Sequence, residues 1–303
     1  LPLAPYLAVG CDPAPFASWP SAPRDAIIFG LKELPEDGTS LPHRHILFGH
    51  AYKGQPAGPA LLARFEAGGG TLYDLESLVD EKGRRVAAFG YWAGFAGAGV
   101  SVLAWAAQDQ GGICPPVSRW ADKGAMVADL AARLGNRRPS ALIIGALGRV
   151  GTGTADLCGS LGLAVTRWDM AETAFGGPFP EVLEHDLFFN CILARPGCPV
   201  FVPADAGSLP RRLRVIGDIA CDPGSAFSPV PVYSTATDWA APVVRVHDRP
   251  PLDVMAIDNL PSLLPIESSQ DFAAQLLPHL MTLDALDRGV WGRAAAEFRR
   301  FTG

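Results

Sequence analysis

The stretch ALIIGALGRVGTG, residues 141–153, decides the fold of this chain. Four apolar residues typical of a buried strand run into glycines at 145, 148 and 151, and helical spacing follows over 154–163. Glycines at such a turn permit a tight bend and let the backbone approach a pyrophosphate at the N-terminus of the helix. The stretch therefore indicates a dinucleotide site. A plain strand–helix–strand unit is the alternative, because Ala146 stands where the usual fingerprint has its first glycine.

An acidic residue after the next strand favours the dinucleotide site. The apolar run 164–168 ends at Asp169, about 20 residues beyond the glycines, where a carboxylate can hold both ribose hydroxyls. Asp169 favours NAD over NADP, because a 2′-phosphate would meet a like charge. Arg167 instead favours NADP, because its positive charge could pair with the 2′-phosphate. We expect NAD as the cofactor.

Strand-like and helix-like segments alternate along the rest of the chain. The first series of apolar runs, with a helical pattern over 59–67, comprises 26–29, 46–48, 71–73 and 86–89. The second comprises 141–144, 164–168, 187–192, 213–219 and 254–257. This alternation predicts an α/β protein with mostly parallel sheets. We expect two Rossmann-like domains with the active site in the cleft between them.

The two series set the expected domain boundaries. Residues 1–93 with 268–303 form the expected substrate and catalytic domain, and residues 94–267 form the expected NAD-binding domain. The tail over 267–301 has the pattern of two helices that pack back on the first domain. The polar stretch 108–119 is expected to be a surface loop.

Composition excludes several classes of protein. The chain has 303 residues, of which 49% are hydrophobic and 18% charged, so it can bury a core and is too apolar for disorder. Lys and Arg number 25 against 31 Asp and Glu, and this net charge of −6 argues against a nucleic-acid partner. The six cysteines form no CxxC pair, which favours a reducing, cytoplasmic location.

One long uncharged segment raises the question of a membrane span. Residues 86–107 contain no charged side chain, and their length matches the roughly 20 residues of a membrane helix. The segment has eight Ala and four Gly but a single Leu, and such a composition inserts poorly into a bilayer. We expect a helix buried in the core, and no membrane partner.

Two basic side chains directly follow apolar strands of the first series. Lys32 follows the run that ends at residue 29, and His50 follows the run that ends at residue 48. Carboxyl ends of parallel strands line one crevice, where desolvation and neighbouring cations would let Lys32 act as a base. Ordinary loop residues are the alternative. The spacing of His43, His45 and His50 matches no standard ligand pattern, so no metal site is expected.

Several longer motifs carry a family resemblance. They are GLKE (30–33), FGHAYK (48–53), GTLYDLE (70–76), GRRVAAFG (83–90), the glycine turn at 145–153, and IDNLPSLLP (257–265). In order and over nearly the whole chain, these motifs resemble the lysine-forming, NAD-dependent saccharopine dehydrogenases. More distantly, the arrangement is similar to alanine dehydrogenase and to the nucleotide domain of transhydrogenase.

The resemblance implies an oxidoreductase that acts on a CH–NH donor. Such an enzyme cleaves saccharopine with NAD and water to L-lysine and 2-oxoglutarate, or runs the reverse condensation. By resemblance, Lys32 accepts the proton of the substrate's secondary amine. His50 is then the acid–base group for water addition and carbinolamine collapse. Small molecules are the expected partners, and we expect a monomer or a weak homodimer.

The resemblance also implies binding residues. Those at family substrate positions, with Glu76 tempering the charge of the lysines, are Lys53, Gln55, Glu76, Arg85, Phe89, Ala220, Cys221 and Asp222. Those at family cofactor positions are Arg84, Gly145, Gly148, Arg149, Gly151, Asp169, Thr173, Leu193, Ile219, Ile257, Asp258, Asn259 and Leu260.

Three departures from the family leave alternatives open. The family has some tens of residues before the stretch that matches 17–19, including an arginine for a substrate carboxylate; either that segment is missing from this sequence or the substrate differs. Val150 replaces a cysteine that some relatives have, so no disulfide to Cys191 can form. Cys221 is unusual at its position. The alternatives are a related NAD-dependent oxidoreductase acting on another opine-like secondary amine or imine, and a catalytically silent NAD-binding regulatory protein.

Overall fold

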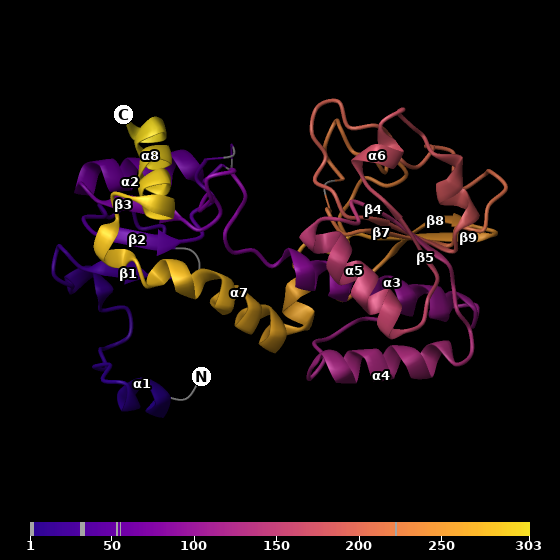
Figure 1. Ribbon diagram of the computed structural model, residues 1–303, viewed down its shortest axis with the longest axis horizontal. Helices are drawn as coiled ribbons and strands as arrows, with labels where there is room; N and C mark the ends of the chain where they lie inside the picture. The colour runs from indigo at the N-terminus through magenta and orange to yellow at the C-terminus, as the bar shows by residue number, and fades with distance from the viewer. Residues whose placement is uncertain (1–2, 31–33, 53, 55, 222) are drawn as a thin grey trace. The chain divides into compact units, whose positions relative to one another are not determined.

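The computed structural model describes residues 3–30, 34–52, 54, 56–221 and 223–303, which form two compact units (Figure 1). Unit 1 comprises Leu1–Ala87 with Ala274–Gly303, and unit 2 comprises Ala88–Ala273. The expected boundaries lay at residues 93 and 267, against 87 and 273 here. Both units are α/β, with sheets that are mostly parallel. The predicted fold class is therefore confirmed.

Unit 1 is built on a small parallel sheet. Its strands, in the order β1-β2-β3, are β1 (Ile27–Phe29), β2 (Arg44–Leu47) and β3 (Thr71–Asp74). Helix α2 (Gly58–Gly68) makes the crossover from β2 to β3 and ends at Gly69, whose φ of 73° is the left-handed conformation that favours glycine. The register pairs Leu47 with Asp74, so both strands end at the same level.

The C-terminal tail completes unit 1, as predicted. It contains the end of α7 (Pro265–Leu280), a short helix η4 (Leu283–Ala285) and α8 (Gly289–Thr302). Helix α8 packs against the sheet and α2: Trp291 meets Tyr73, and Phe298 meets Phe65, each at 5.9 Å between ring centroids. Two short helices, α1 (Ala4–Ala8) and η1 (Trp19–Ser21), precede the sheet.

The prediction of a strand over 86–89 is wrong. In this region only Arg85 pairs, with Val79 in an isolated bridge, and helix α3 (Gly90–Gln108) begins at the next residue after the run. The run is apolar because it leads into a buried helix and stacks Phe89 on Phe272 at 4.5 Å. Short apolar runs do not distinguish a buried strand from the approach to a buried helix.

Unit 2 is a doubly wound sheet of six strands in the order β5-β4-β6-β7-β9-β8. The strands are β4 (Ala141–Ile144), β5 (Val165–Trp168), β6 (Leu187–Asn190), β7 (Val215–Asp218), β8 (Val244–Asp248) and β9 (Pro251–Met255). All pairings are parallel except β8 with β9, and β8 had not been predicted. Because β5 and β6 flank β4 on opposite sides, the order in which strands are added to the sheet reverses at β4. The carboxyl end of β4 is therefore the topological switch point of the sheet.

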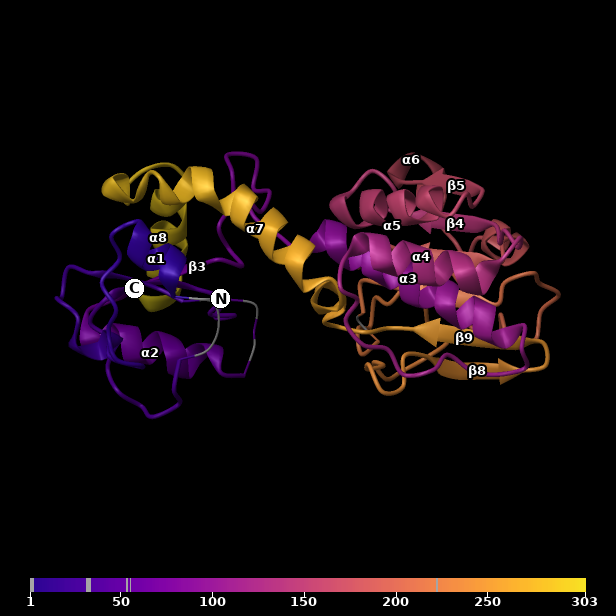
Figure 2. The same ribbon diagram turned by 90° about the horizontal axis from the view of Figure 1, so that it is seen from below.

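Helices cover this sheet, as Figure 2 shows for α3, α4 (Lys123–Leu134) and α5 (Arg149–Ser160). Shorter helices are α6 (Met170–Thr173), η2 (Pro180–Glu184) and η3 (Leu260–Leu263). Helix α3 is almost entirely buried, which confirms the expectation for the uncharged segment. Within the described residues, no helix has both the length and the apolar character needed to cross a membrane.

Small residues let α3 and α5 approach closely. A Cβ atom added at Gly94 of α3 would lie 1.9 Å from the carbonyl oxygen of Val150, and one at Gly153 of α5 would lie 1.9 Å from that of Tyr91. The glycines of the uncharged segment thus serve helix packing. This contact holds the start of α5, and with it the glycine turn, against the core.

Candidate functional site

In unit 1, the ends of two neighbouring strands bring a histidine and a carboxylate together. His50 follows β2 and Glu76 follows β3. Nδ1 of His50 lies 2.7 Å from Oε2 of Glu76, and Oε1 of Glu76 accepts a hydrogen bond of 3.0 Å from Nη1 of Arg85. Three residues that the sequence analysis had selected therefore form one contiguous His50–Glu76–Arg85 group.

This arrangement selects the ring nitrogen that can exchange a proton. The Glu76 carboxylate is only an acceptor, so Nδ1 of His50 carries the hydrogen and Nε2 is the basic nitrogen. The His50 side chain is 41% exposed and that of Glu76 is 16% exposed, so Nε2 remains accessible while its partner is largely enclosed. A histidine held in this way can take a proton from water and return it to a leaving amine.

The backbone at His50 is in an unusual conformation. Its φ is 47°, in the left-handed region that residues with a side chain rarely adopt. Such a conformation costs on the order of 1–3 kcal/mol and persists only where surrounding contacts hold it. Strain of this kind is common at functional sites, and here it coincides with the residue chosen from sequence.

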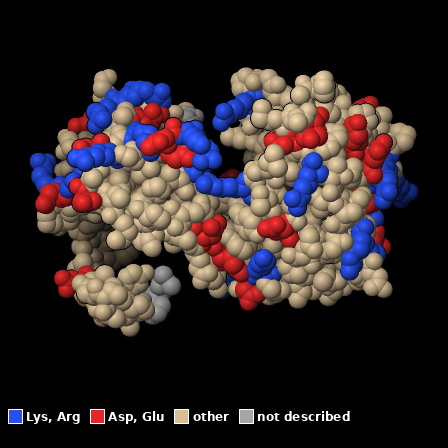
Figure 3. Space-filling model, in the orientation of Figure 1, with Lys and Arg blue, Asp and Glu red and all other residues tan. Residues whose placement is uncertain are grey.

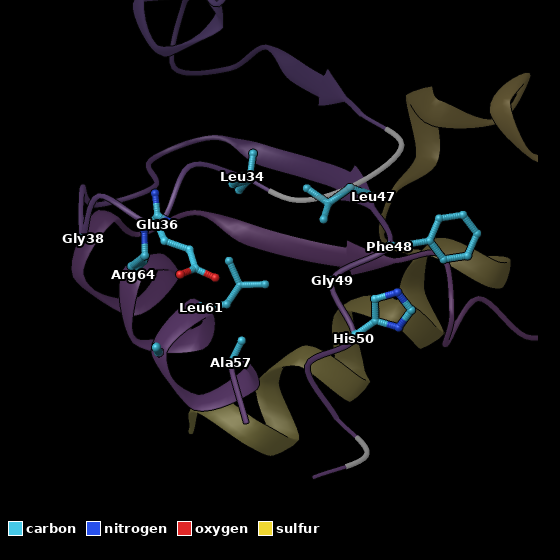
Figure 4. A pocket seen from close by; sticks show the side chains of 11 residues that line it. Leu34, Glu36, Gly38, Leu47, Phe48, Gly49, His50, Ala57, Leu61 and Arg64 are labelled. Carbon is cyan, nitrogen blue, oxygen red and sulfur yellow. The ribbon is translucent and has the colours of Figure 1, made fainter. Parts of the chain in front are cut away.

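A cavity of about 550 Å³ lies beside His50 in unit 1. In Figure 4, His50 and Phe48 lie at one side of it, and Glu36 and Arg64 lie at the other. The remaining wall is mostly apolar and consists of Leu34, Leu47, Gly38, Gly49, Ala57, Ala60 and Leu61. The sequence did not predict this cavity, because its wall comes from β2, α2 and the loop after β1, which meet only in the fold.

Four selected residues lie outside the described part of the chain: Lys32, Lys53, Gln55 and Asp222. Two others, from the motif at 83–90, occupy different surroundings. Arg84 is exposed and pairs with Asp80, Nε to Oδ2 at 3.1 Å. Phe89 belongs to unit 2 and stacks on Phe272.

The glycine turn of unit 2 forms a cradle that side chains would fill. Gly145 has φ 87°, and a Cβ atom there would lie 2.4 Å from Cγ2 of Ile192. A Cβ atom at Gly151 would lie 2.2 Å from the carbonyl oxygen of Gly145. Gly148 is the N-cap of α5, and in the part of the chain that the structure describes no side chain caps this helix. The first N–H groups of α5, starting with exposed Arg149, therefore fit the pyrophosphate of a dinucleotide.

Asp169 lies directly beside this turn. Its Oδ2 accepts a hydrogen bond of 3.0 Å from the backbone of Leu147, and its Oδ1 accepts one of 2.9 Å from Met170 at the start of α6. Thr173 bonds back to the carbonyl of Asp169 at 2.9 Å. The carboxylate is thus fixed at the carboxyl end of β5, beside the turn where the ribose of a dinucleotide would lie.

The other selected cofactor residues differ in exposure. Leu193 is 65% exposed, and Asp258 and Asn259 are also exposed. The side chains of Ile219, Ile257 and Leu260 are buried in the core beside α3. A contribution of these three residues to cofactor binding would therefore come from their backbone atoms.

Sequence analysis missed a buried polar group at the ends of β6 and β7. Nδ2 of Asn190 donates to Oδ1 of Asp218 at 2.9 Å, and the hydroxyl of Tyr233 donates to Oδ2 at 2.8 Å. The backbone N–H of Cys221 also donates to Oδ1, at 3.3 Å, which fixes the loop that carries Ala220. Polar residues that end otherwise apolar strands were the available signal.

The cysteine near the turn is an unreactive core residue. Among the described residues, none of the six cysteines forms a disulfide. Burial raises the pKa of the Cys191 thiol to about 12, and the neighbouring Thr154 hydroxyl lies 3.5 Å from its Sγ. Val150 is at the first turn of α5, so the position that holds a cysteine in some relatives is apolar here.

Comparisons with known proteins agree with this geometry. Residues 1–96 match the family model "Alanine dehydrogenase/PNT, N-terminal domain". The saccharopine dehydrogenase [NAD(+), L-lysine-forming] of Schizosaccharomyces pombe is 44% identical over 94% of this chain and 83% of its own length. The enzyme of the same name from Yarrowia lipolytica is 45% identical over 97% of this chain and 84% of its own.

Two further similarities are more distant. The mitochondrial alpha-aminoadipic semialdehyde synthase of Rattus norvegicus is 38% identical, but over 23% of this chain and 8% of its own length. Among solved structures, an L-alanine dehydrogenase superposes with a TM-score of 0.62 at 18% identity, over 98% of this chain and 86% of that one. This likeness concerns the fold.

Proposed function

The chain belongs to the lysine-forming, NAD-dependent saccharopine dehydrogenases, and we therefore propose that it catalyses the reversible cleavage of saccharopine to L-lysine and 2-oxoglutarate. The observation that carries this proposal is the His50–Glu76–Arg85 group. It supplies an oriented proton acceptor at the end of β2, in unit 1, whereas the glycine turn belongs to unit 2. The relatives reported above carry the name saccharopine dehydrogenase, which favours this activity over the other two candidate functions.

The residues of unit 2 fit NAD. The cradle of Gly145, Gly148 and Gly151 with the N-terminus of α5 would hold the pyrophosphate, and Asp169 would hold the ribose hydroxyls. When bound there, NAD would supply the hydride acceptor for oxidation at the carbon beside the secondary nitrogen of saccharopine. The protein's own residues must position that carbon of the substrate and transfer the protons.

Proton transfer is assigned to unit 1. The secondary amine must lose its proton before the substrate is oxidised, and Lys32 is the proposed base. The resulting imine then reacts with water: Nε2 of His50 takes a proton as the water oxygen bonds to carbon. In the next step the protonated ring donates to the nitrogen of the carbinolamine, the C–N bond breaks, and the amine leaves as lysine. Loss of the hydroxyl proton completes 2-oxoglutarate.

Glu76 supports these steps electrostatically. Its carboxylate keeps Nδ1–H of His50 in one orientation and offsets the positive charge that the ring gains when Nε2 is protonated. Arg85 bonds to the other oxygen of Glu76, which holds that carboxylate in place. Arg85 and Lys53 are also proposed to attract the substrate carboxylates, since guanidinium and ammonium groups both pair with carboxylates.

The test is NADH oxidation by the purified full-length protein with 2-oxoglutarate and lysine. We expect turnover that requires both compounds. Replacing lysine with ornithine or another amine is the matched control. Turnover with a different amine, but not lysine, would assign the protein to another opine-like substrate. Tight NADH binding with no turnover would support the silent NAD-binding protein.

We also propose that small molecules are the partners of this protein and that it works in the cytoplasm as a monomer or weak homodimer. Six cysteines without a disulfide in the described chain support a reducing compartment. On the face drawn in Figure 3, basic side chains lie among acidic ones, an arrangement that does not favour nucleic acid. Sedimentation velocity across a hundredfold range of concentration tests the oligomeric state.

A further inference from the structure

Asp74 is a buried carboxylate beside the His50–Glu76–Arg85 group. It is the last residue of β3, and the residue is 1% exposed. Three backbone N–H groups donate to it: those of Gly49 and Glu76 to Oδ1, at 3.2 and 2.9 Å, and that of Ala51 to Oδ2, at 3.3 Å. One side chain therefore bonds to both neighbours of His50 and to Glu76 itself.

These bonds act where the backbone needs support. His50, the residue with the left-handed backbone, lies between Gly49 and Ala51 in the chain, and the N–H groups of both neighbours donate hydrogen bonds to Asp74. Gly49 permits the close approach, because a Cβ atom there would lie 2.8 Å from Cδ2 of Leu72 and 3.4 Å from Oδ2 of Asp74. The loop after β2 is thus folded around the carboxylate rather than extended away from it.

We propose that Asp74 is the positioning residue of the proton-transfer group. By binding the backbone on both sides of His50 and at Glu76, it fixes the two side chains at the 2.7 Å contact between Nδ1 and Oε2. That contact decides which ring nitrogen carries the hydrogen. Through it, Asp74 determines that Nε2 of His50 is the nitrogen that exchanges the proton. The effect on turnover rests on the proposed function, whereas the effect on His50 does not.

The substitution Asp74→Asn tests this role with little change in volume. An amide replaces one acceptor oxygen with a donor, so at least one of the three backbone N–H groups must face another N–H. We expect kcat for NADH oxidation to fall about 10-fold to 100-fold, with KM for lysine and Kd for NADH near wild type. In ¹⁵N-histidine-labelled protein, the His50 signals should shift from the Nδ1–H toward the Nε2–H tautomer.

Asp253→Asn is the matched control. Asp253 is a fully buried aspartate on β9 that binds Arg245 and accepts a 2.7 Å hydrogen bond from Gln108. Its substitution should lower the midpoint of thermal unfolding but leave the His50 tautomer and kcat unchanged. If Asp74→Asn kept wild-type kcat and tautomer, or if both variants lost kcat in equal proportion, the proposal would be overturned.

Two measurements keep the test decisive in other circumstances. If Asp74→Asn does not fold, amide exchange in the wild-type protein decides: slow exchange at Gly49, Ala51 and Glu76 supports the proposal, and exchange at the rate of a free loop overturns it. If the wild-type protein shows no lysine-dependent turnover, the proposed function fails. The His50 tautomer in Asp74→Asn still decides the role of Asp74, because it needs no substrate.

Discussion

At the scale of single residues, one carboxylate binds two nitrogen-bearing side chains. Glu76 bonds to His50 with one oxygen and to Arg85 with the other, so it orients the imidazole ring and is itself held in place. The sequence selected these three residues separately, from strand-end position and family motif. Their contact depends on the fold, since 26 positions of chain separate His50 from Glu76.

Substitution of the histidine should remove acid–base catalysis. We expect His50→Gln to lower kcat by roughly 10²-fold or more, because the substitution removes the side chain that is proposed to exchange the proton. Kd for NADH should remain within about twofold of wild type, since the glycine turn is in unit 2. Stopped-flow oxidation of NADH and fluorescence titration measure the two quantities.

His185→Gln is the control for this change. His185 lies at the end of η2, where it bonds to Thr166 at 2.8 Å, and it belongs to unit 2. Wild-type turnover is expected for the control. Wild-type turnover in His50→Gln would contradict the assignment of the base.

The cofactor carboxylate makes a second prediction at this scale. Asp169→Ala should raise Kd for NAD at least about tenfold, because a charged hydrogen-bonding partner contributes roughly 1.5–3 kcal/mol. Loss of the like charge should also narrow the preference for NAD over NADP. Calorimetric titration with each nucleotide measures both effects. Asp156→Ala, which removes an exposed carboxylate of α5, should leave both affinities unchanged, and unchanged affinity in Asp169→Ala would disprove the ribose contact.

At the scale of elements, close packing of α3 on α5 positions the glycine turn. The contact depends on Gly94 and Gly153, because a Cβ atom at either position would overlap a backbone oxygen of the other helix. Composition already indicated a buried helix over 86–107, and the structure shows why the segment is rich in Gly and Ala rather than Leu. The same small residues that disfavour membrane insertion allow this packing.

Enlarging this contact should destabilise the protein. We expect Gly153→Ala to lower the free energy of unfolding by about 1–3 kcal/mol, because the new methyl group would overlap the backbone oxygen of Tyr91. Gly159→Ala, on the same helix with no atom within 4 Å of the added Cβ, should instead stabilise by about 0.5–1 kcal/mol. Urea unfolding measures both variants, and equal effects would refute the role of the contact.

At the scale of the whole molecule, unit 1 contains a titratable group in its core. His45 of β2 is fully buried between Trp19 and Phe65, and both ring nitrogens lack a hydrogen-bond partner within the described chain. Burial lowers the pKa of His45 to about 4 from an ordinary value of 6.5, and the charges of His43 and Arg64 act in the same direction. The neutral ring is therefore the form that the fold requires.

This burial predicts how stability depends on pH. The unfolded chain binds more protons than the folded chain between pH 6.5 and about 4, so the contribution of His45 is present above pH 6.5 and lost as the pH falls. The total loss is on the order of 3 kcal/mol. Urea unfolding from pH 4 to 7 should show a steeper slope in wild type than in His45→Phe. Equal slopes would contradict the prediction.

The sequence predicted the fold wherever local pattern is sufficient. Apolar runs of four to seven residues located β4 to β7 and β9, because strands buried on both faces, such as β4 and β6, are mostly apolar. The run at 86–89 was misassigned and β8 was missed, since β8 is an edge strand with exposed and partly exposed residues. Hydrophobic pattern therefore identifies a strand when the whole strand is buried, but not when the strand is partly exposed or when an apolar run leads into a buried helix.

What the sequence by itself determined is the class of fold, the glycine turn with its acidic partner, and the residue types needed for proton transfer. These depend on local spacing and on motifs that are contiguous in the chain. The tertiary structure alone decided that Glu76 bonds to His50, that Asp74 accepts bonds from Gly49 and Glu76, and that Asn190 bonds to Asp218 in unit 2. Each of these contacts joins the ends of neighbouring parallel strands, and it forms because helical crossovers set the strand register that places those ends side by side.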